Sequence, residues 1–140
     1  MPEDLYPKIY LYRRIVQAKM FIDEHFHDNI NLAEIADEAF FSKFHFIRLF
    51  STIYDKTPHQ YLITVRIDHA KLLLRTKMPV AEVCFEVGFT SVSSFSGLFR
   101  KLVGQSPSAY QSQQHKLLIA VAEMPFNFIP NCFAEKKGWT

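Results

Sequence analysis

Apolar residues recur at helical spacing along most of the chain, and the same arrangement occurs twice. Within residues 32–39 they stand at positions i, i+3, i+4 and i+7, and residues 80–87 repeat this order. A second apolar stripe follows each segment. The two stripes are Phe46, Leu49, Phe50 and Ile53 in the first case and Phe95, Leu98, Phe99 and Leu102 in the second. The pattern predicts pairs of short amphipathic helices, and no segment predicts a β-strand.

The two pairs of helices are copies of one unit. Residues 32–61 recur as residues 80–110 with nine identities, besides the shared serines Ser42 and Ser91, and with one residue inserted in the turn. A serine in N-cap position, Ser42 or Ser91, precedes the second helix of each copy. Two short helices joined by a turn of about three or four residues make a helix-turn-helix, so the chain is expected to contain two such units.

Helix-start signals divide the rest of the chain. Thr57-Pro58 and Ser106-Pro107 each place an N-cap residue before a proline at the first helical position. The helix from Pro58 is expected to run to about Thr76, roughly 28 Å, and a helix within residues 9–26 is expected to cover the first unit. The expected order is an N-terminal lead (1–14), a first helix-turn-helix unit (15–56), a linker helix (57–77), a second helix-turn-helix unit (78–111), and a C-terminal helix extension with an apolar tail (112–140). The predicted fold is all-α, with two helix-turn-helix subdomains and about seven helices.

Composition excludes several classes of protein. The longest uninterrupted apolar run is the six residues Leu117–Ala122, and the chain opens without a basic-then-apolar leader, so we expect a cytoplasmic protein without a membrane segment. Cys84 and Cys132 have no neighbouring cysteine, the histidines are scattered, and no HExxH, GxSxG or GKS/T motif occurs. We therefore expect no catalytic residues, no metal site and no cofactor.

The net charge of +2 is spread unevenly along the chain. Residues 1–39 carry four Lys/Arg against eight Asp/Glu, residues 40–116 carry ten against four, and residues 117–140 carry two against two. A positive middle region indicates a polyanionic partner such as DNA. An ordinary solvated surface could carry the same numbers of charged residues. Charge alone therefore does not distinguish a DNA-binding surface from an ordinary one.

The region from about Ile15 to Gln111 resembles the DNA-binding domain of the AraC/XylS family of transcriptional regulators. The most diagnostic segment is VAEVCFEVGFTSVSSFSGLFRKLVGQSPSAY, residues 80–110. The first copy agrees through Ser42, His45, Arg48, Phe50 and Pro58, and the linker helix through Arg66, Ala70, Leu73 and Leu74. The resemblance implies that each unit offers a recognition helix to one of two adjacent major grooves of double-stranded DNA, often with bending of the DNA.

The resemblance also implies which residues contact DNA. The expected base contacts are Phe44, His45, Ile47 and Arg48 in the first recognition helix and Val92, Ser93, Ser94, Ser96 and Gly97 in the second. The expected phosphate contacts are Ser42, Lys43, Ser91, Arg100 and Lys101. Arg48 is the strongest candidate for base recognition because its guanidinium can pair with guanine O6 and N7; a phosphate contact or an ion pair is the alternative.

The chain departs from the family pattern at four positions. Phe40 and Asp55 stand where the first unit usually has glycine, and Pro79 replaces a polar N-cap. Gly97 replaces a side chain that is often long and polar or basic. With three serines nearby, the second recognition helix has little reach to base edges, so we predict that its half-site is recognised mainly by shape.

The two ends of the chain bear on its partners. Many family members carry a sensor domain, and only about 14 residues precede the first unit here, so we expect a protein that binds DNA as a monomer or meets a sensor on another chain. RNA polymerase is a further candidate partner. The apolar tail after Pro125 is expected to fold back on the domain, with a docking patch as the alternative. An all-α adaptor that binds protein through this tail is the competing function.

Overall fold

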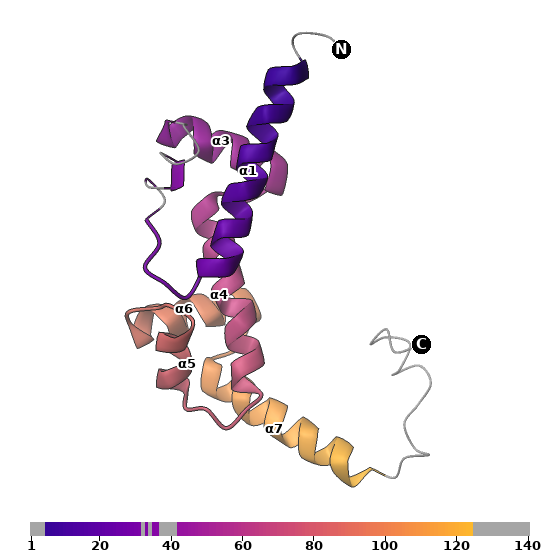
Figure 1. Ribbon diagram of the computed structural model, residues 1–140. Coiled ribbons are helices and arrows are strands. Elements are labelled where there is room, and N and C mark those ends of the chain that lie inside the picture. The colour runs from indigo at the N-terminus through magenta and orange to yellow at the C-terminus, as the bar shows by residue number, and fades with distance from the viewer. Residues whose placement is uncertain (1–4, 32, 34, 37–41, 125–140) are drawn as a thin grey trace.

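The computed structural model describes residues 5–31, 33, 35–36 and 42–124, and every regular element in these ranges is a helix (Figure 1). The helices are α1 (Leu5–His25), α3 (Lys43–Tyr54), α4 (Pro58–Leu74), α5 (Val80–Glu86), α6 (Val92–Val103) and α7 (Pro107–Glu123). Ala33, Ile35 and Ala36 are helical as well, between α1 and α3. The prediction of an all-α fold is confirmed. Leu32 and Ala39 of the first apolar stripe, and Phe40, which stands where the family pattern has glycine, lie outside the described residues.

The helices of the two units begin and end where local chemistry dictates. The side chains of Ser42 and Ser91 accept hydrogen bonds from the backbone N–H groups of His45, at 3.3 Å, and Ser94, at 3.4 Å. Both helices end on a residue in the left-handed conformation, which is Gly104 in α6, at φ 94°, and Asp55 in α3, at φ 58°. Aspartate tolerates this conformation better than most residues, so the first unit keeps the turn without the glycine.

The other helix boundaries differ in part from expectation. Helix α4 begins with a capping box between Thr57 and Gln60 and ends at Leu74, two residues before the expected end. Pro79 caps α5 without a side-chain hydrogen bond, as its chemistry requires. Helix α1 begins at Leu5, four residues before the expected start at residue 9, so residues 5–14 of the expected N-terminal lead belong to this helix.

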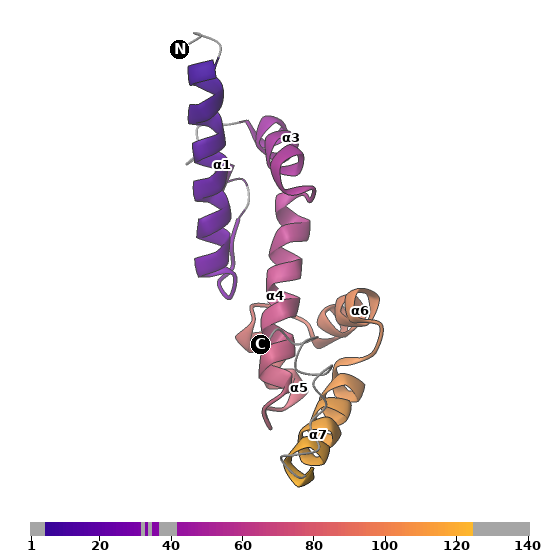
Figure 2. The same cartoon turned by 90° about the vertical axis from the view of Figure 1, so that its right-hand side faces the viewer.

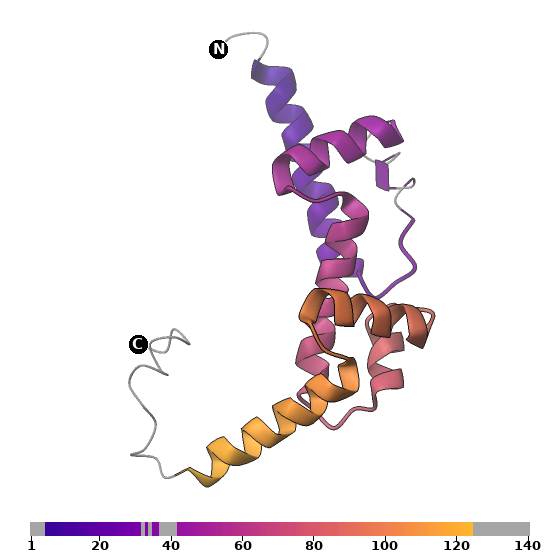
Figure 3. The same cartoon turned by 180° about the vertical axis from the view of Figure 1, so that it is seen from behind.

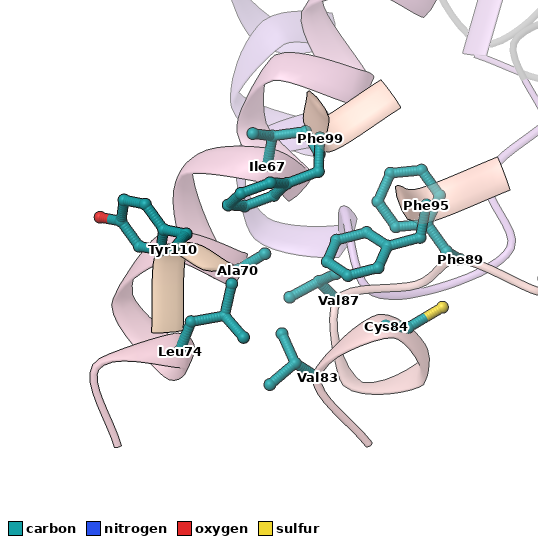
Figure 4. Packing of buried hydrophobic residues seen from close by; sticks show 10 residues of the cluster. All are labelled: Ile67, Ala70, Leu74, Val83, Cys84, Val87, Phe89, Phe95, Phe99 and Tyr110. Carbon is teal, nitrogen blue, oxygen red and sulfur yellow. The ribbon is translucent and has the colours of Figure 1, made fainter. Parts of the chain in front are cut away.

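Helix α4 lies between the two units and contributes to a separate core in each (Figure 2). The first core consists of Ile15, Ala18, Ile22, Ile35, Ala36, Phe46, Phe50 and Leu62. The second consists of Ile67, Ala70, Leu74, Val83, Cys84, Val87, Phe89, Phe95, Phe99 and Tyr110, whose side chains point toward one another (Figure 4). Equivalent pairs of phenylalanines, Phe46 with Phe50 and Phe95 with Phe99, are buried in the two cores, as the stripes predicted. Leu102 is an exception, because 52% of its surface is exposed.

The two units meet around Phe26, which packs against both cores. Arg66 of α4 donates from Nε to the backbone oxygen of Phe26, at 2.7 Å, and from Nη2 to that of Asp28, at 2.9 Å. The guanidinium also lies 5.6 Å from the centroid of the Phe89 ring. A Cβ added at Gly88 would lie 2.7 Å from the Phe26 oxygen, so only glycine allows this approach.

Gly88 and Gly97 form a matched pair for testing this junction. Gly88 has φ +104° and no space for a methyl group, whereas a Cβ at Gly97 would meet nothing within 4 Å. We expect Gly88→Ala to lower the free energy of unfolding by at least about 1 kcal/mol and Gly97→Ala to raise it by about 0.5–1 kcal/mol. Urea denaturation of both variants measures this. Equal effects of the two substitutions would contradict the account.

Helices α1 and α4 are also joined by polar contacts in the first unit. The Tyr61 hydroxyl donates to Asp23 Oδ1, and Lys19 Nζ lies 2.9 Å from Asp23 Oδ2. Burial and the hydrogen bond to the Asp23 carboxylate raise the pKa of Tyr61 to about 12, from an ordinary value of 10.0. The folded state therefore favours the protonated phenol.

This raised pKa predicts how stability depends on pH. The contribution of Tyr61 is fully present below about pH 10 and is lost as the pH rises toward about 12, because the unfolded chain releases the proton first. We expect the free energy of unfolding to fall less steeply over this range in Tyr61→Phe than in the unsubstituted chain. Denaturation at a series of pH values tests this, and parallel curves for the two proteins would show that Tyr61 does not contribute.

Candidate nucleic-acid interface

Helices α3 and α6 occupy equivalent places in the two units. In Figure 3, α3 crosses in front of α1 and α6 crosses in front of α4, and the serine-capped starts of both helices lie on the same side of the molecule, at the right of the view. Because the buried phenylalanines hold the opposite faces of α3 and α6 inward, each helix presents its other face to solvent. The fold thus displays two similar helix faces from one chain.

The outward face of α3 is apolar and basic. Phe44 is 81% exposed, and His45 and Arg48 are exposed as well. Ile47 is half-buried, so only part of its side chain is accessible. Of the four residues expected to contact bases here, three therefore stand clear of the core.

The outward face of α6 is made of short side chains. Ser93, Ser94 and Gly97 are exposed, Val92 is exposed at 37%, and Ser96 is half-buried. Ser93 and Gly97 take the places that Phe44 and Arg48 take in α3. This face therefore lacks long side chains where α3 has two.

Basic residues are placed differently on the two helices. Helix α3 carries Lys43 and Arg48 in its first half, and α6 carries Arg100 and Lys101 in its last turn. All four are exposed. The α3 residues equivalent to Arg100 and Lys101 are Ser51 and Thr52, whose hydroxyls donate to the carbonyl oxygens of their own helix at 2.8 and 2.9 Å. The expected phosphate contacts Ser42 and Ser91 act as N-caps, and Ser91 is half-buried.

A hollow that the sequence did not predict lies between α3 and α6, and we call it the interhelix trench. It combines two adjoining cavities of about 630 and 440 Å³, which share His59, Ile63 and Leu98. Its polar and charged lining residues are Asn29, Asn31, Lys43, Lys56, His59, Gln60, Thr64, Arg66, Thr90, Ser94 and Lys101. None of the described residues that line it is Asp or Glu. The available sequence signal was the run from Lys43 to Arg66, in which Asp55 is the only acidic residue.

The described part of the chain offers no place for a metal ion. Within it, no three His, Cys, Asp or Glu side chains gather as a ligand set. Cys84 is buried, and burial raises the pKa of its thiol, which opposes formation of the reactive thiolate. Among the described helices, none is long and apolar enough to cross a lipid bilayer.

Comparison with known proteins identifies the family. A family described as a helix-turn-helix domain matches residues 35–113, which is more than half of the chain. The chain belongs to the AraC-type helix-turn-helix family. Members of this family are transcriptional regulators and not enzymes, so the expectation of no catalytic activity is confirmed.

Curated relatives of this AraC-type domain are longer proteins. The probable transcriptional regulator LumQ of Photobacterium leiognathi is 40% identical over 92 residues, which are 65% of this chain and 37% of LumQ. The MmsAB operon regulatory protein of Pseudomonas aeruginosa is 36% identical over 94 residues, which are 66% of this chain and 31% of that protein. The chain thus spans about a third of the length of each.

Solved AraC-type domains share the fold. The DNA-binding domain of AdpA, a global transcriptional factor solved in complex with a target DNA, matches with a TM-score of 0.68 and 33% identity, over 71% of this chain and 90% of that one. An AraC-type regulator from Chromobacterium violaceum matches with a TM-score of 0.67 and 21% identity, over 74% and 94%. The described helices are therefore arranged as in AraC-type DNA-binding domains.

The division of α3 into an inward and an outward face can be tested by two substitutions of the same kind. Phe50 is fully buried, whereas Phe44 is 81% exposed. We expect Phe50→Ala to lower the free energy of unfolding by about 3–5 kcal/mol and Phe44→Ala to change it by less than about 0.5 kcal/mol. Thermal or urea denaturation measures both. A large loss of stability in Phe44→Ala would mean that this side chain packs within the fold.

Proposed function

We propose that this AraC-type domain is the DNA-binding part of a transcriptional regulator and inserts α3 and α6 into adjacent major grooves of double-stranded DNA. The observation that carries the proposal is the display of two equivalent helix faces by one chain. The AdpA domain, which has the same fold and was solved with a target DNA, supports it. A groove recurs about every 34 Å along one face of DNA, so two recognition helices in one chain can meet successive grooves without dimerisation.

The first helix would supply most of the base recognition. Arg48 is exposed on its outward face and can form a bidentate contact with guanine. Phe44 and the accessible part of Ile47 can contact thymine methyl groups, and His45 lies beside them in the first turn. Lys43 and the N-cap Ser42 would bind phosphate.

The second helix would position the protein on the DNA and would contribute little to the recognition of base sequence. Val92, Ser93, Ser94, Ser96 and Gly97 offer short side chains with little reach into a groove. Arg100 and Lys101, together with the N-cap Ser91, would bind phosphates. Recognition of this half-site would then depend on the shape and deformability of the DNA.

The domain would act as a monomer within a larger regulatory system. Because both recognition helices belong to one chain, a monomer suffices on DNA. A cytoplasmic regulator of this kind would act through RNA polymerase or through a sensor on the same or another chain.

An adaptor that binds protein is the second candidate, and one observation favours it. The second half of α7 exposes Leu117, Leu118, Ile119 and Val121, and the C-cap residue Met124 is exposed as well. Such a surface fits a protein partner. The apolar tail after Pro125, which the adaptor hypothesis also invokes, lies outside the described residues.

Two measurements separate the candidates. Selection of bound sequences from a random duplex pool should enrich two half-sites on one face of the DNA. Gel shifts over a salt series should show affinity falling steeply as salt rises, because phosphate contacts release counterions. An adaptor would enrich no sequence and would show no binding at any salt concentration.

Arg48 can be tested within the selected site. We expect Arg48→Ala to weaken binding by about 1–3 kcal/mol and to relax the base preference at one position of the first half-site. The matched control is Arg75→Ala, because Arg75 is an exposed arginine beyond the end of α4 and away from both recognition helices. A base-by-base scan should give larger losses in the first half-site than in the second. Equal losses in the two half-sites would contradict the proposed difference between α3 and α6.

A further inference from the structure

We propose that the interhelix trench is a third DNA-binding surface, in which the first turns of α4 and the preceding Lys56 bind the phosphodiester backbone between the two major grooves. The inference rests on the proposed function, because it requires α3 and α6 to sit on DNA together. It adds residues that neither the motif nor the recognition helices include. These are Lys56, His59, Gln60 and Thr64.

The position of the trench leads to this inference. Residues of both recognition helices line it: Lys43 at the start of α3, and Ser94, Leu98 and Lys101 of α6. Helix α4 forms its floor, and the segment after α1 and the turn before α6 complete the lining. When two helices occupy successive major grooves on one face of DNA, a minor groove with its two phosphate ridges lies between them on that face. DNA held by both helices must therefore pass over the trench.

The charges of the trench fit a polyanion. Lys43, Lys56, Arg66 and Lys101 line it together with His59, and no acidic side chain offsets them among the described lining residues. Arg66 is already engaged by the carbonyl oxygens of Phe26 and Asp28. Lys56 is therefore the cation on the floor that is placed to reach a ligand.

The side chains on the floor are also oriented for such a contact. Lys56 Nζ lies 3.4 Å from Thr64 Oγ1, so the lysine extends along the first two turns of α4. The capping box uses Gln60 Oε1, which accepts from the backbone N–H of Thr57 at 2.9 Å, and does not use the amide NH₂ group. His59 and Gln60 are exposed. Ammonium, imidazole and amide donors thus line one strip of α4.

The trench also has an apolar strip of Ile63, Leu98 and the exposed Leu102, which an acidic peptide of a protein partner could contact. DNA is favoured because residues of both recognition helices line the trench, so DNA bound by these helices would cover the strip and exclude a peptide. Binding of DNA in the trench and binding of a peptide there would have different effects on the salt dependence of DNA binding in Lys56→Gln.

The experiment compares two variants that each remove one positive charge. Lys56→Gln changes the trench, and Lys71→Gln changes the other end of α4, outside the trench lining. Binding to the selected duplex is measured over a salt series, with thermal unfolding as a check on folding. We expect Lys56→Gln to reduce the slope of log affinity against log salt by about 0.9, the value of one phosphate contact, and Lys71→Gln to leave it unchanged.

A second measurement locates the contact on the DNA. Ethylation of phosphates between the two half-sites should weaken binding of the unsubstituted chain and should have a smaller effect on Lys56→Gln. The inference is overturned if Lys56→Gln keeps the full salt slope, as it would if the trench bound an acidic peptide. It is also overturned if Lys71→Gln lowers the slope equally, because the effect would then be one of net charge. If the unsubstituted chain enriches no DNA, the proposed function itself fails.

Discussion

The guanidinium of Arg66 connects the two units of this protein. It binds the carbonyl oxygens of Phe26 and Asp28 and lies against the ring of Phe89, where the segment after α1 meets the turn of the second unit. Burial lowers the pKa of Arg66, but a guanidinium stays protonated in proteins, so both hydrogen bonds are charge-assisted. Without this junction the relative placement of α3 and α6 would depend on α4 alone.

The importance of that junction follows from the size of the two cores. Each contains only a small set of buried side chains, and α4 supplies residues to both. A small core leaves little stability in reserve, so each unit depends on the helix that it shares with the other. Recognition of two half-sites at a fixed spacing requires this kind of connection, because a loose linker would let the two helices bind at variable distances.

The two units share a backbone but differ in chemistry. Bulky and basic side chains stand on the outward face of α3, whereas α6 has short side chains there and carries its cations in the last turn. The proposed roles follow from this difference: α3 recognises bases, α6 sets position, and the trench between them binds the intervening backbone. The affinity of the domain for DNA would then come from three surfaces, and its sequence preference mainly from one.

Much of the fold was predictable from local sequence. The internal repeat, the apolar stripes and the serine caps were sufficient to predict the helices and to separate the buried Phe46 and Phe50 from the outward Phe44 and Arg48. Even the left-handed conformation of Asp55 agrees with the repeat, because Asp55 is equivalent to Gly104 in the second copy. These features depend on residues a few positions apart, and the periodicity of a helix relates such positions directly.

The structure alone decided how these parts meet. The bonds of Arg66 to Phe26 and Asp28, and that of Tyr61 to Asp23, join residues 38 to 40 positions apart, and no periodic pattern relates such residues. The trench was missed for the same reason, because its lining comes from α3, α4, α6 and the segment after α1. The sequence thus determined which residues face outward on each recognition helix. Only the packing of α1, α4 and α5 decided how the two faces are placed relative to each other and what lies between them.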